Sequence, residues 1–156
     1  MQQLNLPHYP FKIKSETQSK YIFDNIRRRY VLLTPEEWVR QNFTAWLVNE
    51  KGYPVPLIAI EMSLKTARMD RRADIVVFSR QGKPVMIIEC KAPSVRISQK
   101  VFDQVARYNM DFKVDYLAVS NGMVHYCAKL DHEAGTWLFL KEFPDFDVII
   151  GGNQVL

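Results

Sequence analysis

Two neighbouring segments decide the fold: Arg72-Ala-Asp-Ile-Val-Val-Phe78 and Pro84-Val-Met-Ile-Ile-Glu-Cys-Lys91. Both are rich in β-branched and aliphatic residues, and the Gln81-Gly82 pair between them is typical of a turn. We therefore expect two antiparallel strands. In such a pair Asp74, near the start of the first strand, comes close to Glu89, at the end of the second.

The second segment carries an acid and a lysine at alternate positions. Side chains alternate across a strand, so Glu89 and Lys91 share one face while Cys90 points to the other. Charged groups in an apolar setting are costly to bury unless they are paired or bound to metal. The sequence thus predicts that two carboxylates, Asp74 and Glu89, and one ammonium converge.

Such a group suits a divalent cation and phosphodiester hydrolysis. Mg²⁺ takes oxygen ligands and keeps several waters, so two carboxylates and a main-chain carbonyl suffice. We expect Asp74 and Glu89 to supply the carboxylates and Cys90 its backbone carbonyl, with Mn²⁺ as a substitute ion. Lys91 could orient the attacking water and stabilise negative charge that builds on the phosphate.

A structural interpretation of the same residues stands beside this one. Glu89 and Lys91 could form an ion pair at a strand end, and Asp74 could pair with Arg71 or Arg72. In that case added magnesium would not change the thermal stability of the protein.

A helix is expected from Thr34 to the stop at Gly52. Thr34 can cap it, Pro35 fits its first turn, and Glu37 completes a capping box. Its pattern is amphipathic and predicts packing on a sheet. The face expected in the core holds Trp38, Phe43, Trp46 and Leu47, and the opposite face holds Arg40, Gln41, Asn49 and Glu50.

The other elements follow from local patterns. Residues 57–62 read as a strand, 63–72 as a polar loop or extended connection, and 98–112 as a helix capped by Ser98. Strands at 115–120 and 123–129 flank Asn121-Gly122, a signal for a two-residue hairpin. A short strand is expected at 137–140, and residues 1–33 are left unassigned. The order of helix, three strands, helix and strands predicts a mixed α/β sheet with helices on its faces.

Composition sets wider bounds. The chain has 156 residues, 47% of them hydrophobic, a net charge of +4 and a pI near 9.1. This length predicts a single domain over residues 1–156, with a basic N-terminal segment at 1–33. No apolar run is long enough to span a bilayer and no secretory signal is visible, so we expect a cytoplasmic location without a membrane partner. The two cysteines, Cys90 and Cys127, are expected to be reduced thiols.

Several ordered motifs together resemble a known family. They are Thr34-Pro-Glu-Glu-Trp-Val-Arg-Gln41, Arg72-Ala-Asp-Ile-Val-Val-Phe78, Ile88-Glu-Cys-Lys-Ala-Pro93, Gln104-Val-Ala-Arg-Tyr-Asn109 and Ser120-Asn-Gly122. Over about residues 21–130 the chain resembles the amino-terminal nuclease domain of type I restriction enzyme restriction subunits, within the PD-(D/E)XK nuclease superfamily. The resemblance implies a restriction-endonuclease-like mixed β-sheet flanked by helices, with an αβββαβ core. It also implies Mg²⁺-dependent DNA endonuclease activity.

The resemblance also implies roles for single residues. Asp74 and Glu89 would bind magnesium, and Lys91 would be the catalytic lysine. Gln104 and Tyr108 match the family's Gln-x-x-x-Tyr element, which would support DNA binding or cleavage.

Glu37 matches the acid of the first helix in such nucleases, which reaches the metal. Its place in the expected capping box explains the same residue equally well, and Glu36 ranks behind it.

The chain departs from the family in two respects. Ala73 stands where the superfamily name has proline, and the phosphate loop of the motor that follows in restriction subunits is not present. Because the phosphate loop of the motor is missing, we consider a separate motor or specificity subunit as a partner besides DNA. Cutting both DNA strands would require two active sites, so a homodimer is also considered. The alternative function is a catalytically silent or partner-dependent DNA-binding or assembly module with the same fold.

Basic residues suggest where DNA would bind. Arg71, Arg72 and Lys100 flank the expected metal site, so we favour them as phosphate contacts. A second basic group comprises Lys12, Lys14, Lys20 and the run at 27–29. It could contact a phosphate backbone or form an ordinary solvated face.

His125 and Cys127 share a strand face and could ligate zinc in principle. Their spacing does not match structural zinc sites, so zinc is not expected.

Overall fold

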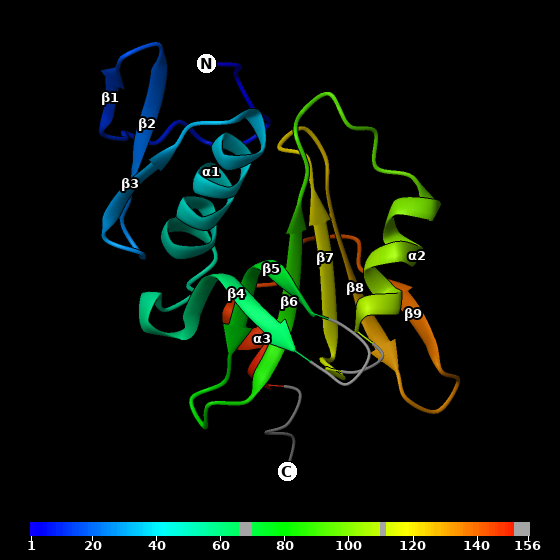
Figure 1. Cartoon of the computed structure of the whole chain (residues 1–156). Helices are drawn as coiled ribbons and strands as arrows, with labels where there is room; N and C mark the ends of the chain where they lie inside the picture. The colour runs from blue at the N-terminus through cyan, green and yellow to red at the C-terminus, as the bar shows by residue number, and fades with distance from the viewer. Residues whose placement is uncertain (66–69, 110–111, 152–156) are drawn as a thin grey trace.

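The computed structural model describes residues 1–65, 70–109 and 112–151. A six-stranded sheet lies at its centre, with α1 (Pro35–Glu50) and α3 (Phe146–Gly151) on one face and α2 (Gln99–Tyr108) on the other (Figure 1). The strands are β4 (Ile58–Lys65), β5 (Asp70–Phe78), β6 (Pro84–Cys90), β7 (Tyr116–Ser120), β8 (His125–Asp131) and β9 (Thr136–Phe139).

The six strands lie side by side in sequence order. All neighbours are antiparallel except β6 and β7, which are parallel. A parallel pair needs a crossover connection, and α2 supplies it. The expected order of helix, three strands, helix and strands in a mixed sheet is confirmed among the described residues.

Helix α1 begins as its sequence predicts. The Thr34 hydroxyl accepts a hydrogen bond from the backbone N–H of Glu37 over 3.0 Å, and Pro35 occupies the first turn. The helix ends at Glu50, and Gly52 follows it with a φ of +73°. Glycine adopts this positive φ without strain, which suits the residue after a helix end.

One expectation for α1 was wrong. Arg40 and Gln41 were placed on its solvated face, yet they are only 5% and 7% exposed. Asn49 and Glu50 are exposed as expected. Arg40 and Gln41 are buried because carboxylates from other elements lie within hydrogen-bonding distance, and such partners offset the cost of removing a charge from water.

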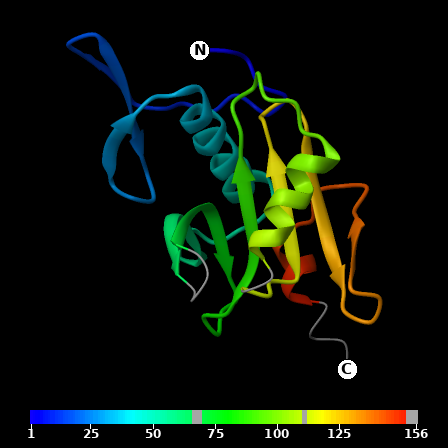
Figure 2. The ribbon, with the colours of Figure 1, turned by 45° about the vertical axis from the view of Figure 1, so that its right-hand side comes forward.

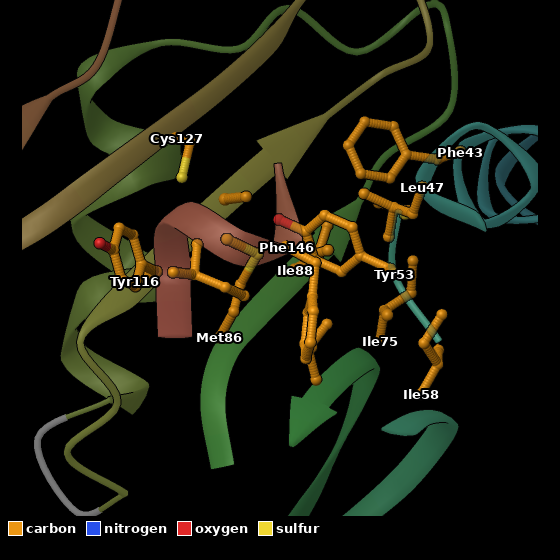
Figure 3. Packing of buried hydrophobic residues seen from close by; sticks show 14 of the residues in the cluster. Phe43, Leu47, Tyr53, Ile58, Ile75, Met86, Ile88, Tyr116, Cys127 and Phe146 are labelled. Carbon is orange, nitrogen blue, oxygen red and sulfur yellow. The ribbon is translucent and has the colours of Figure 1, made fainter. Parts of the chain in front are cut away.

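Both faces of the sheet are packed. On the α1 side, Phe43 and Leu47 join Ile75 and Ile88 of the sheet and Phe146 of α3 in one buried cluster (Figure 3). Helix α2 lies over the other face of the sheet (Figure 2). The core on that side is built from residues of α2, β5, β6, β7 and β8, and its buried members include Phe102, Val105, Val76, Ile87, Leu117 and Val119. The expected packing of the helix beginning at Thr34 on a sheet is confirmed.

The hairpin at Asn121-Gly122 exists, but its loop was predicted too short. Residues 121–124 separate the paired ends of β7 and β8, where Ser120 lies opposite His125. The Asn121 side-chain oxygen accepts hydrogen bonds from the backbone N–H groups of residues 123 and 124, each over 2.9 Å. This side chain takes the place of a backbone carbonyl and so widens the turn.

The expected loop at 63–72 was also partly wrong. β4 continues to Lys65 and β5 begins at Asp70, and these two residues lie opposite each other in the ladder. Residues 66–69 lie outside the described part of the chain. The ends of the other predicted strands differ from the observed ends by one or two residues. The helix predicted at 98–112 corresponds to α2, which ends at Tyr108. Residues 110–111 of that prediction lie outside the described part of the chain.

The unassigned N-terminal region forms a sheet of its own. β1 (Ile13–Glu16), β2 (Ser19–Asp24) and β3 (Arg29–Leu32) pair in antiparallel fashion. This three-stranded sheet stands beside α1, apart from the six-stranded sheet (Figure 1, Figure 2). A short 3₁₀ helix, η1 (Val55–Leu57), precedes β4.

No helix in the described part of the chain is long and apolar enough to cross a membrane.

Candidate active site

The two predicted carboxylates lie at neighbouring positions of β5 and β6. Ile75 pairs with Ile88, so the antiparallel register places Asp74 next to Glu89. Asp74 Oδ2 also accepts a hydrogen bond from the backbone N–H of Cys90 over 2.8 Å. The convergence that the sequence predicted for these two acids is therefore present.

Lys91 follows directly after β6. Its Nζ lies 3.5 Å from Oε1 of Glu89, and its backbone N–H donates to the Ser120 carbonyl over 2.8 Å. The Cys90 side chain instead packs in the core on the α1 side, where burial raises the pKa of the thiol. The site thus takes its two acids and its lysine from the end of one strand pair.

Each carboxylate has an arginine partner, and the partner of Asp74 is not the one that the structural interpretation named. Arg40 Nη1 donates to Asp74 Oδ1 over 2.8 Å, and Arg71 Nη2 donates to Glu89 Oε2 over 2.8 Å. In the structural interpretation, Asp74 would pair with Arg71 or Arg72. The structure gives it Arg40 because α1 lies over this end of β5, a contact between distant segments.

A network of charged side chains extends from these pairs toward the N-terminal sheet. Arg27 donates to Asp24 (2.6 Å), Glu37 (3.1 Å) and Glu61 (3.1 Å). Arg40 hydrogen-bonds Glu37 and forms an ion pair with Glu61 over 3.2 Å. Strand β2 with the turn after it, helix α1, and strands β4 and β5 therefore meet in one largely buried ionic network.

Gln41 also belongs to the network. Its side-chain amide donates to Asp24 Oδ2 and to Glu37 Oε2, each over 3.0 Å. The carboxylate of Glu37 is thus engaged with side chains of the network, while its backbone N–H serves the cap on Thr34. The sequence offered two explanations for Glu37, a capping role and a role in the site. In the structure the two are compatible, because they use different atoms of the residue.

Glu61 has an unusual backbone. Its φ is +50°, and it stands at the register position opposite Asp74, between the pairs Ile60–Ile75 and Met62–Ala73. A residue other than glycine in this region costs about 1 to 3 kcal/mol and persists only when its surroundings fix it. Here the fixing contacts are the ion pairs with Arg27 and Arg40, and a further pair with Arg72 (3.5 Å).

Electrostatics at the carboxylate pair favour a positive charge. Burial, and then repulsion by Asp74, raise the pKa of Glu89 to about 7, against the lowering effect of Arg71 and Lys91. Burial also raises the pKa of Asp74, although the N–H of Cys90 and the charge of Arg40 oppose it. Two buried acids side by side cannot both ionise easily, so a proton or a cation is favoured between them.

The donor set fits a hard divalent ion that keeps water. Within the described residues, no three His, Cys, Asp or Glu side chains come together as a metal site. Two carboxylate donors from Asp74 and Glu89, completed by a main-chain carbonyl and waters, match the habit of Mg²⁺ and do not match zinc.

Glu36 and Glu37, the two acids of the first turn of α1, differ in their surroundings. Burial and the charge of Arg40 act on Glu37 in opposite directions, and the hydrogen bonds and charge of Arg40 prevail, so its pKa is lowered. Burial and the charge of Asp74 raise the pKa of the more exposed Glu36. Of these two acids, Glu37 is therefore the one that ionises more readily.

Other predicted residues lie elsewhere. Gln104 and Lys100 are exposed on α2, outside the ionic network of the described residues. Tyr108 is in α2, and its side chain lies outside the description. Both ring nitrogens of His125 are hydrogen-bonded within the protein, Nδ1 to Ser120 Oγ (2.7 Å) and Nε2 to the Asn5 carbonyl (3.0 Å).

Sequence reasoning missed Asp24, Arg27, Arg40, Gln41 and Glu61 as members of the site. One signal was available for Glu61, which is a lone acid within the apolar run at 57–62. A cleft of about 650 Å³ opens beside the network, between β3 and the first turns of α1, and Ala92 also lines it.

The fold and site define an α/β protein with a buried carboxylate pair at the end of a strand hairpin. The family model described as Type I restriction enzyme R protein N terminus (HSDR_N) matches residues 35–144. This match covers more than half of the chain, so the chain belongs to that family.

A solved structure has the same fold. It is a fragment named as an HsdR subunit of a type I restriction enzyme from Vibrio vulnificus YJ016, with a TM-score of 0.55 and 20% sequence identity. The match covers 76% of this chain and 25% of that chain, so this chain spans about a quarter of its length. At this identity the likeness concerns the fold alone. No curated protein matches the chain.

Proposed function

We propose that this chain is a Mg²⁺-dependent DNA endonuclease of the PD-(D/E)XK type with a restriction-endonuclease-like core, acting in restriction-modification. The observation that carries the proposal is the placement of Asp74 and Glu89 side by side, with Lys91 Nζ 3.5 Å from Glu89. Membership of the family of type I restriction R protein N termini supports it.

Each residue has a role in this proposal. Asp74, Glu89 and the backbone carbonyl of Cys90 would hold Mg²⁺, or Mn²⁺ in its place. The bound ion would supply a Lewis acid that neutralises the phosphate and acidifies a water. Lys91 hydrogen-bonds the attacking water and the scissile phosphate. The water oxygen bonds to phosphorus and gives one proton to solvent, the bond to the leaving sugar oxygen breaks, and that oxygen takes up a proton from solvent.

The arginines keep the carboxylates in place before the ion arrives. Arg40 holds Asp74 and also contacts Glu37 and Glu61, so the two other acids would keep Arg40 in place beside a metal-bound Asp74. Glu37 is ionised and approaches Asp74 through their shared arginine. We assign it the place of the helix acid that supports the metal, through water.

The proposed nuclease function also assigns residues that would bind DNA and the partners that would be needed. Arg71, Arg72 and Lys100 would contact DNA phosphates, and Gln104 and Tyr108 would support binding on α2. A separate motor or specificity subunit would bring the nuclease to DNA. Cutting both strands requires two active sites, which a homodimer would provide.

The test is cleavage of supercoiled plasmid DNA with Mg²⁺ or Mn²⁺. Wild-type protein is compared with Glu89→Ala and Lys91→Ala, and with Glu142→Ala, which changes an exposed acid elsewhere. Nicking by the wild type and by Glu142→Ala, and its loss in the other two, is the expected result. Equal nicking by the wild type and by Glu89→Ala would contradict the assignment of the active site to Asp74 and Glu89.

A second candidate is favoured by the arginine partners themselves. Arg40 and Arg71 already satisfy Asp74 and Glu89 without a metal ion. The chain would then be a silent or partner-dependent DNA-binding or assembly module. That function predicts no turnover with either metal and unchanged DNA binding after Asp74→Ala.

A further inference from the structure

The net positive charge of the chain is concentrated in residues 1–33. This segment carries six Lys and Arg against two Asp and Glu, whereas residues 34–156 carry fifteen of each. The segment also lies outside residues 35–144, which match the family model. Arg27 is held by acids of the ionic network, and the other five cations of the segment add a basic surface to an otherwise neutral chain, which favours a polyanionic partner.

One face of this small sheet combines aromatic rings with lysines. Residues directly opposite in an antiparallel ladder share a face, and Tyr21 lies opposite Lys14, as Phe23 lies opposite Tyr30. Lys12 joins them, because its carbonyl accepts the N–H of Phe23 over 2.8 Å. We call Lys12, Lys14, Tyr21, Phe23 and Tyr30 the aromatic-lysine face.

The other face of β2 points toward the rest of the protein. Ile22 and Asp24 alternate with Tyr21 and Phe23, and both are buried. Asp24 is held there by Arg27 and Gln41. The aromatic-lysine face is consequently the one turned outward.

On this face, lysine side chains lie over aromatic rings, and two of the rings contact each other. Lys14 Nζ lies 4.4 Å from the ring centroid of Tyr30, and Lys12 Nζ lies 5.8 Å from that of Phe23. The Phe23 and Tyr30 rings meet edge to face at 5.2 Å, and Tyr30 is 38% exposed. Lys14 also approaches Glu16 over 3.5 Å, but both side chains are largely in water, so this pair is weak.

We propose that the aromatic-lysine face binds single-stranded nucleic acid. Bases would stack on Tyr30 and Tyr21, and Lys12 and Lys14 would neutralise phosphates along the strand. Aromatic rings with interleaved cations on an open sheet are the surface that unpaired bases need. A duplex keeps its bases stacked on each other, so these rings would gain nothing from it.

The position of the face connects it to the carboxylates. Tyr30 and Leu32 of β3 line the same cleft as Glu37, Arg40 and Glu61. A single strand held on the sheet would therefore lead into the cleft beside Asp74 and Glu89. This guiding role rests on the proposed nuclease function, whereas the binding itself does not.

The test measures binding without metal. The full chain is titrated in EDTA against a fluorescent 20-nucleotide oligo-dT and a 20-base-pair duplex, and anisotropy is followed at several salt concentrations. Tyr30→Ala should weaken oligo-dT binding at least fivefold, since one stacked base is worth about 1 kcal/mol or more. Lys14→Gln should weaken it and lower the salt slope by about 0.7.

Matched controls lie on the large sheet. Tyr126 is similarly exposed (42%), and Lys129 Nζ lies 5.8 Å from the ring of Tyr116, as a counterpart of Lys14 over Tyr30. Tyr126→Ala and Lys129→Gln should leave binding unchanged. Tyr30→Leu keeps an apolar contact with Phe23 and should bind as weakly as Tyr30→Ala. Tyr30→Trp keeps an aromatic ring and should bind as tightly as the wild type.

Three outcomes would overturn the proposal. They are an affinity for duplex equal to that for oligo-dT, equal binding by Tyr30→Leu and wild type, and equal losses in the Tyr30 and Tyr126 variants. Because no metal is present, these outcomes are independent of plasmid cleavage and of its loss in Glu89→Ala.

Discussion

Arg40 donates a hydrogen bond from Nη1 to Oδ1 of Asp74 over 2.8 Å, between two side chains that are both buried. The same guanidinium contacts Glu37 and Glu61. One cation from α1 therefore contacts three acids that come from α1, β4 and β5. Glu37 and Glu61 also pair with Arg27, so removing Arg40 would chiefly leave the buried carboxylate of Asp74 without its arginine.

Arg40→Ala should lower the free energy of unfolding by about 3 to 5 kcal/mol, as expected when one partner of a buried ion pair is lost. Urea unfolding measures it. Arg72→Ala is the control, since that side chain is 70% exposed and its pair with Glu61 should contribute 1 kcal/mol or less. Similar losses in both variants would contradict the importance of the buried network.

Glu89→Gln should change the pH dependence of stability. The folded state raises the pKa of Glu89 from its ordinary 4.5 to about 7, so it binds the proton more tightly than the unfolded chain does. This contribution to stability is complete below pH 4.5 and is lost as the pH rises through 7. Glutamine does not titrate, so the variant should be about 2 to 3 kcal/mol more stable than wild type at pH 8.

The measurement is urea unfolding without metal at pH 4.5, 6 and 8. The two proteins should agree at the lowest pH and diverge as the pH increases. Glu142→Gln, on an exposed residue, should follow the wild type throughout. A stability gap for Glu89→Gln that does not vary with pH would show that Glu89 is not protonated in the fold.

Magnesium binding should compete with that proton. At pH 8 the ion should stabilise the wild type by about 2.7 kcal/mol at a concentration one hundred times its Kd, and less at pH 6. Asp74→Asn should remove most of the stabilisation. Thermal unfolding with and without Mg²⁺ measures this, and calorimetry in two buffers should detect proton release near pH 6.5. An unchanged melting temperature would favour the purely structural ion-pair interpretation.

The backbone of Glu61 gives a test that is independent of function. Glycine normally weakens a strand relative to alanine, but at a φ of +50° it avoids a cost of about 1 to 2 kcal/mol. Glu61→Gly should therefore be more stable than Glu61→Ala. At the neighbouring Met62, which pairs regularly with Ala73, the order of the glycine and alanine variants should reverse. The same order at both positions would rule out backbone strain at Glu61.

The sequence was informative where the site is local. Asp74, Glu89 and Lys91 belong to one strand hairpin, so alternation and a turn signal were enough to bring them together. Helix α1 was predictable because its cap, proline and stop lie within its own sequence. The mixed sheet followed from the order of these elements.

The sequence was not informative where distant segments meet. Arg27, Arg40, Glu61 and Asp74 come from four separate elements. A charged residue on a helix looks the same whether it faces water or a buried acid, so Arg40 was placed on the wrong face. The short strands of residues 13–32 escaped notice because their polar and basic residues gave no clear periodicity.

Lys91 tests the proposed chemistry most directly, because it is half-buried and sits beside the metal site without being one of its ligands. Lys91→Ala should lower the rate of plasmid nicking by a factor of about 100 or more, which is typical for the loss of one transition-state contact. It should leave the fold intact and keep the stabilisation by Mg²⁺ that Asp74→Asn removes. Lys100→Ala, which changes an exposed lysine on α2, should reduce DNA binding and leave metal binding unchanged. Cleavage by Lys91→Ala at the wild-type rate would show that Asp74 and Glu89 act without this lysine.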